Sequence, residues 1–211
     1  MAHDGQDMTM VNPTILPDLL ALTKSAVGPV GAILDIAREK LRETVSTDGR
    51  ISGQLIDENQ TASHGLAWLA TYVESLRQMQ FWAERQQADG KFGEMEQLLL
   101  QITFGEYLWQ VYGGIPMNQG EILRLQDIGL TQDDMRSMMD PAVMALTQGG
   151  NTQAARTRLV ELMQEQNGAT MFGASGLDEE LEMIRDQFRR YAVEKVEPFA
   201  HEWHLKDELI P

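Results

Sequence analysis

The chain has 211 residues, enough for one large domain or two small ones, and its content of 43% apolar and 23% charged residues is typical of globular proteins. Its 17 basic and 32 acidic residues give a formal net charge of −15, which repels phosphate backbones and anionic lipid heads, so nucleic acids and membrane surfaces are poor candidate partners. The absence of cysteine excludes disulfides, zinc–thiolate sites and thiol nucleophiles, and it favours a cytoplasmic location.

Neither end of the chain carries a convincing targeting segment. The opening residues, MAHDGQDMTM, are acidic and lack the apolar core of a secretory signal. The longest apolar stretch, AVGPVGAILDIA, is interrupted by Pro29 and is shorter than the roughly 20 residues of a membrane span. Lys206-Asp207-Glu208-Leu209 spells an endoplasmic-reticulum retention signal, but Ile210 and Pro211 follow it, and that signal is read only at the extreme C-terminus.

The first two helices are predicted from apolar residues at helical spacing. Residues 19–45 form the first, and Pro29 with its neighbouring glycines is expected to kink or divide it. The stretch STDGRISG, residues 46–53, is predicted to be a turn. Residues 62–87 carry two apolar stripes, which predicts a core helix between two neighbours in preference to an aromatic ligand site; the stripes are Leu66, Leu69, Val73 and Leu76, and Trp68, Tyr72, Met79 and Trp82.

Shorter helices are predicted to follow a third long helix at residues 94–114. Gly105 within that helix is expected to allow a close helix crossing. Thr131 is the predicted N-cap of the first of the shorter helices, paired with Asp134. Pro141 breaks the next helical segment, and another helix begins at Asn151 or Thr152. No alternating strand longer than about four residues is present, and no hairpin dipeptide separates two such runs, so the predicted fold class is all-α.

The chain is predicted to consist of a helical region at residues 1–166, a linker at 167–176 and a final helical segment at 177–211. The linker, NGATMFGASG, is rich in small residues and contains three glycines. The final segment has the most regular helical pattern in the chain, with acidic residues in its first turns and arginines after them, an order that suits the helix dipole. Its apolar positions are Leu177, Leu181, Ile184, Phe188, Tyr191 and Phe199.

Four possible site motifs are rejected. His201 and His204 lie three residues apart, whereas the zinc-protease pattern needs four, and neither they nor His64 follow the Glu-x-x-His pattern of di-iron bundles. The stretch GATMFGAS has the glycine spacing of a phosphate loop but places Ala174 where lysine is required. His64 is interpreted as a capping or buried hydrogen-bonded residue and not as a member of a catalytic triad. No catalytic residue and no metal ligand is therefore predicted.

Residues 177–211 resemble the beginning of the acyl-CoA dehydrogenase fold. In that family a long charged and aromatic helix leads to a proline, a small residue and a tryptophan, and a second helix follows an acidic-apolar-proline stretch. Phe188, Pro198, Ala200, Trp203 and the sequence DELIP stand at these places, although His204 replaces a residue that is often acidic. One branch of the family carries a long helical extension before this point, and the whole chain resembles the N-terminal part of such an enzyme.

The resemblance implies a flavoprotein whose chemistry lies outside the given residues. It implies FAD, an acyl-CoA substrate, an electron-transferring flavoprotein as electron acceptor and a homodimer. The family adds a middle β-domain and a C-terminal helical domain, whose glutamate base removes the α-proton while hydride leaves for the flavin. No family site residue maps onto this chain, and neither Glu180 nor Glu194 is assigned a role. The alternative is a stand-alone acidic helical adaptor whose tryptophan and methionine surfaces dock a partner without catalysis.

Overall fold

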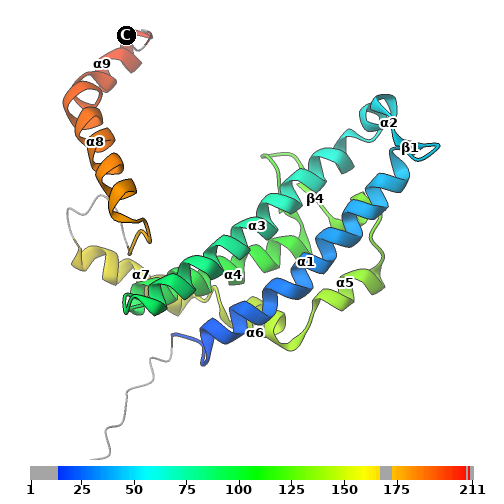
Figure 1. The fold of residues 1–211 in the computed structure, drawn as a ribbon, viewed down its shortest axis with the longest axis horizontal. Helices are drawn as coiled ribbons and strands as arrows, with labels where there is room; N and C mark the ends of the chain where they lie inside the picture. The colour runs from blue at the N-terminus through cyan, green and yellow to red at the C-terminus, as the bar shows by residue number, and fades with distance from the viewer. Residues whose placement is uncertain (1–13, 167–172, 208, 210–211) are drawn as a thin grey trace, which may run out of the picture. The chain divides into compact units, whose positions relative to one another are not determined.

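The computed structural model describes residues 14–166, 173–207 and 209, and divides into two compact units, Met1–Ala174 and Ser175–Pro211 (Figure 1). The predicted all-α class is confirmed, because strands occur only as two pairs of two residues each in the described ranges. In the first unit the elements are α1 (Leu19–Thr44), β1 (Ser46–Thr47), β2 (Arg50–Ile51), α2 (Gly53–Glu58), α3 (Gln60–Ala88), α4 (Glu94–Gly113), β3 (Ile115–Pro116), β4 (Ile122–Leu123), the 3₁₀ helix η1 (Leu125–Ile128), α5 (Gln132–Met138), α6 (Pro141–Gly149) and α7 (Gln153–Glu165).

The three long helices of the first unit form its framework. Helix α3 packs against both α1 and α4, while α6 contacts α1 and α4, and α7 packs on α4 (Figure 1). Both predicted stripes of α3 are used, since Leu69, Val73 and Leu76 are buried and Tyr72 is nearly so. The prediction of a core helix lying between two neighbours is thus confirmed.

Of the two expected effects of Pro29, a kink or a division of the helix, the division is wrong, because α1 runs without a break from Leu19 to Thr44. The residues around it are held from the side by the core, where Ala26, Val30 and Ile33 are completely buried. Burial of this apolar stripe offsets the backbone hydrogen bond that proline cannot make.

By length and composition alone, the 26-residue α1 is also long and apolar enough to cross a membrane. The prediction that this segment does not span a membrane was based on the shorter apolar stretch around Pro29. Core helices of other proteins pass the same test, and α1 supplies core residues to the first unit.

A small hairpin joins α1 to α2 and was missed by the search for alternating strands. Asp48 and Gly49 both have positive φ, 50° and 74°, the conformation that an Asp-Gly turn adopts between paired strands. Only Ser46–Thr47 and Arg50–Ile51 pair on either side. Strands of two residues are too short to show alternation, so the turn was predictable and the hairpin was not.

The predicted caps after residue 130 are confirmed. The amide N–H of Asp134 donates to Thr131 Oγ1 over 3.2 Å, and the Thr131 N–H donates back to Asp134 Oδ2 over 2.8 Å. The backbone and hydroxyl hydrogen bonds from Thr131 lower the pKa of the Asp134 carboxyl. Pro141 is the first residue of α6 and Thr152 caps α7, so the chain changes direction at the predicted positions.

Gly105 permits a close backbone approach, as predicted, although its neighbour is the turn between α6 and α7 and not a helix. A Cβ atom on Gly105 would lie 2.5 Å from the backbone nitrogen of Asn151 and 2.9 Å from the carbonyl carbon of Gly150. Beside it, the completely buried Gln101 donates to the carbonyl of Gly150 over 3.1 Å and to that of Thr14 over 2.9 Å, and its Oε1 accepts from the Leu16 N–H over 2.6 Å. One side chain of α4 therefore joins the segment before α1 to the end of α6.

Two completely buried glutamines are expected to respond oppositely to the same substitution. Gln101→Met removes three hydrogen bonds to backbone groups, one of them fully buried, so the free energy of unfolding should fall by about 2–4 kcal/mol. Gln86 has no side-chain hydrogen-bond partner within the described residues, so Gln86→Met should leave stability unchanged or raise it by about 1 kcal/mol. Urea denaturation of both variants measures this difference in the free energy of unfolding. Equal losses of stability would contradict the conclusion that the hydrogen bonds of Gln101 stabilise the contact between α4, the segment before α1 and the end of α6.

Candidate functional site

A chain of hydrogen bonds crosses the first unit from α3 to the turn before α7. The Tyr72 hydroxyl donates to Gln110 Oε1 over 2.5 Å, and Gln110 Nε2 donates to Glu106 Oε1 over 2.5 Å. The second oxygen of Glu106 accepts from Asn151 Nδ2 over 2.6 Å. Tyr107 stacks on the Tyr72 ring with centroids 4.4 Å apart.

The hydrogen bonds of this network connect α3, α4 and the α6–α7 turn. Burial, followed by the proximity of Tyr107 and Glu106, raises the pKa of Tyr72, so its hydroxyl stays protonated and donates to Gln110. Both carboxylate oxygens of Glu106 accept from side-chain amides, and these fixed contacts connect α3, α4 and the α6–α7 turn. We assign these residues a structural role.

His64 lies beside a surface hollow of about 370 Å³ between α2, the start of α3 and the β3–β4 hairpin. Its Nε2 accepts a hydrogen bond from Trp68 Nε1 over 3.0 Å, one helical turn further along α3. The interpretation as a hydrogen-bonded histidine is confirmed, but the side chain is exposed and not buried. Because Nε2 already accepts a hydrogen bond from the indole N–H, this nitrogen cannot act as a base for a neighbouring serine without breaking the contact.

The other residues tested in the sequence lie in the second unit, which contains α8 (Glu179–Lys195) and α9 (Glu197–Lys206). Glu180 and Glu194 are exposed on α8, and His201 and His204 are exposed on α9. Within residues 14–166, 173–207 and 209, no group of three or more His, Asp or Glu side chains could hold a metal ion. Most of the predicted linker, residues 167–172, and Glu208, Ile210 and Pro211 at the end of the chain lie outside the described residues.

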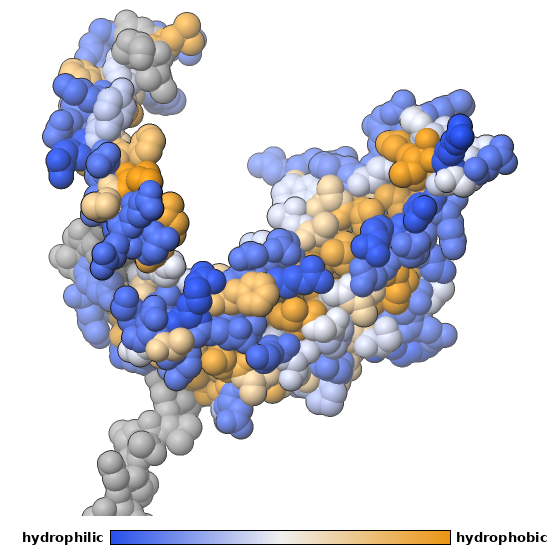
Figure 2. Space-filling model, viewed as in Figure 1, coloured by the Kyte–Doolittle hydropathy of each residue, from blue (hydrophilic) through white to orange (hydrophobic). Residues whose placement is uncertain are grey.

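The most unusual feature of the second unit is an apolar helix face without a core. No residue of α8 or α9 is buried. Phe188 is 72% exposed, Tyr191 63% and Leu181 47%, and they recur at the spacing of one helix face. Apolar side chains consequently reach the surface of this unit among hydrophilic ones (Figure 2).

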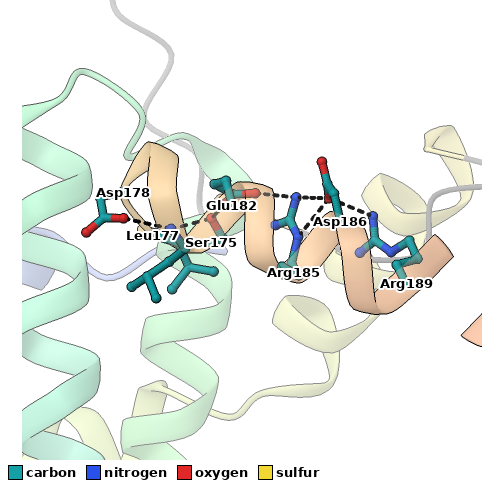
Figure 3. Close-up of polar contacts among 8 residues, drawn as sticks. Ser175, Leu177, Asp178, Glu182, Arg185, Asp186 and Arg189 are labelled. Atoms are coloured by element: carbon teal, nitrogen blue, oxygen red, sulfur yellow. Dashed lines mark hydrogen bonds and ion pairs between the residues drawn. The ribbon is translucent and has the colours of Figure 1, made fainter. Parts of the chain in front are cut away.

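The polar face of α8 is organised by ion pairs within the helix (Figure 3). Arg185 pairs with both Glu182 and Asp186, and Asp186 also lies 3.8 Å from Arg189. Asp178 caps the helix, since its Oδ1 accepts from the Leu181 N–H over 2.9 Å. Such local contacts favour the helix itself, but they contribute only tenths of a kcal/mol each and do not replace a buried core.

A helix with this combination of features is typical of a segment that packs inside a larger protein. No family model matches the chain. It is 56% identical over 202 residues to (2S)-methylsuccinyl-CoA dehydrogenase of Cereibacter sphaeroides. The chain is homologous to part of that dehydrogenase. The aligned region covers 96% of this chain but only 36% of the relative's length.

The similarity confirms the predicted resemblance to the acyl-CoA dehydrogenases, and more specifically to methylsuccinyl-CoA dehydrogenase. It extends through the helical region before residue 177 as well as the final segment, because it covers nearly the whole chain. The sequence did not predict two features of the first unit, which are the hydrogen bonds of Gln101 and the hydrogen-bond network around Glu106. Glutamine and asparagine at ordinary helix positions give no pattern that would reveal them.

Proposed function

We propose that these residues are part of an FAD-dependent dehydrogenase that oxidises methylsuccinyl-CoA to mesaconyl-CoA. The observation that carries the proposal is the 56% identity over 202 residues to a methylsuccinyl-CoA dehydrogenase. The exposed apolar face of α8 supports it, because a helix of 17 residues with no buried side chain needs further protein to cover that face.

The proposal places the enzyme in the ethylmalonyl-CoA pathway, in the cytoplasm, as a homodimer that passes electrons to an electron-transferring flavoprotein. We assign no residue of this chain to FAD. The described residues offer no glycine-rich phosphate-binding turn after a strand, and the polar side chains of Gln101 and Glu106 already form hydrogen bonds within the first unit. FAD and the acyl-CoA would therefore be held mainly by other parts of the complete protein.

The test is a visible absorption spectrum of the complete protein, purified without added flavin. A bound flavin that is bleached by methylsuccinyl-CoA under anaerobic conditions, and much more slowly by butyryl-CoA, is the expected result. Butyryl-CoA is the matched control because it carries the same thioester on an unbranched chain without the second carboxylate. Absence of flavin would contradict the enzyme class, and equal bleaching by both thioesters would contradict the substrate.

The adaptor alternative leads to a different result in the same preparation. An adaptor would contain no flavin, and the 211-residue chain would have the same stability alone as in any longer protein. The first unit has a core of its own, so its folding alone does not separate the two functions. The flavin spectrum does.

A further inference from the structure

The last residue of the first unit, Ala174, is hydrogen-bonded to α3 and α4 through its backbone carbonyl and its N–H. The N–H of Ala174 donates to Glu96 Oε1 over 2.8 Å, and the carbonyl of Ala174 accepts from Trp82 Nε1 over 2.9 Å. Trp82 belongs to α3 and Glu96 to the first turn of α4. Both backbone polar groups of Ala174 are therefore satisfied by side chains of the core helices, which fixes the position of this residue on the first unit.

Glu96 is suited to this contact because it is already fixed. Its side chain is almost completely buried, and its second oxygen accepts from the N–H of Gly93, the N-cap of α4, over 3.1 Å. Hydrogen bonds to an ionised carboxylate are stronger than those between neutral groups, and the positive end of the helix dipole favours the charge at this position.

Gly173 allows the segment to approach. Its φ of +78° lies in the region that favours glycine, and a Cβ atom there would be 3.0 Å from Leu99 Cδ1 and 3.4 Å from Glu96 Oε1. An alanine would therefore meet α4 as well as being strained.

The next residue, Ser175, forms its side-chain hydrogen bonds with residues of the second unit. The Ser175 hydroxyl donates to Glu182 of α8 and accepts from the Leu177 N–H over 3.2 Å (Figure 3). Ala174 is thus held by the first unit, while Ser175 is held by the helix of the second.

We propose that Gly173 and Ala174 form a strap anchored by Trp82 and Glu96, so that the articulation between the two units lies at the junction of Ala174 and Ser175. This differs from the sequence prediction, which treats all of residues 167–176 as linker. The proposal does not rest on the assignment of the protein as a dehydrogenase, and its failure would leave that assignment unchanged.

Amide hydrogen exchange across residues 173–177 tests the anchor. Trp82→Phe removes one donor and keeps a ring, and Gly173→Ala strains the strap; we expect the Ala174 amide to exchange about fivefold faster or more in either variant. Trp109→Phe, on the exposed Trp109 of α4, and Gly90→Ala, at a glycine with φ +68° and no atom near its Cβ position, are the matched controls. Exchange of Ala174 at the unprotected rate in the unmodified protein would overturn the anchor.

Inserted residues test where the articulation lies. The chain has no cysteine, so spin labels can be placed at Thr71→Cys on α3 and Arg190→Cys on α8, both exposed. Four inserted Gly-Ser residues between Thr170 and Met171 should leave the distance distribution unchanged, whereas the same insertion between Ala174 and Ser175 should broaden it. In the Gly173→Ala variant the first insertion should also broaden it. Equal broadening by both insertions in the unmodified chain would show that all of residues 167–176 act as the linker.

Discussion

Gly105→Ala is expected to lower the free energy of unfolding by about 3 kcal/mol, although alanine is the better helix former. The added Cβ atom would lie 2.5 Å from the backbone nitrogen of Asn151, and backbone atoms cannot rotate away as a side-chain end can. The α6–α7 turn would have to move, which would also lengthen the hydrogen bond from Gln101 to Gly150. Thermal and urea denaturation measure the loss.

Gly113→Ala is the matched control, since Gly113 is the last residue of the same helix and nothing lies within 4 Å of its Cβ position. This substitution should be neutral or stabilising by up to about 1 kcal/mol. If both alanine variants shift the denaturation midpoint equally, the close approach at Gly105 is not what limits its replacement.

Phe188→Ala is expected to have effects of very different size on the stability of two forms of the protein. In the 211-residue chain, where the ring is 72% exposed, the free energy of unfolding should change by less than about 0.5 kcal/mol. In the complete protein, where the proposed function expects further protein to cover this face, the loss should reach about 3–5 kcal/mol, as for a buried phenylalanine. Denaturation followed by circular dichroism in both forms, and by flavin release in the complete form, provides the comparison.

Phe81→Ala serves as the control for this comparison. Phe81 is 51% exposed on α3, in a unit that has its own core, so its replacement should have a small effect in both forms. A small effect of Phe188→Ala in the complete protein would show that the α8 face stays uncovered, and would favour the adaptor interpretation.

The two units differ in the interactions that stabilise them. Core residues Leu69, Phe104 and Leu108 give the first unit a buried centre formed by several helices. The second unit has helices stabilised by caps and ion pairs along one face, and its apolar residues remain outside. A helical region that folds around its own core, followed by a helix without one, is the arrangement that the proposed function expects.

The sequence by itself was sufficient for the helical class, for the two-sided α3, for the cap formed by Thr131 and Asp134, and for the resemblance of residues 177–211 to an acyl-CoA dehydrogenase. These features depend on residues close together in the chain, whose spacing is visible as a period or a motif. The continuity of α1 through Pro29, the tie made by Gln101 and the strap at Ala174 were decided only by the tertiary structure. Each depends on contacts between residues far apart in sequence, such as Gln101 with Thr14 or Trp82 with Ala174, whose partners no local pattern specifies.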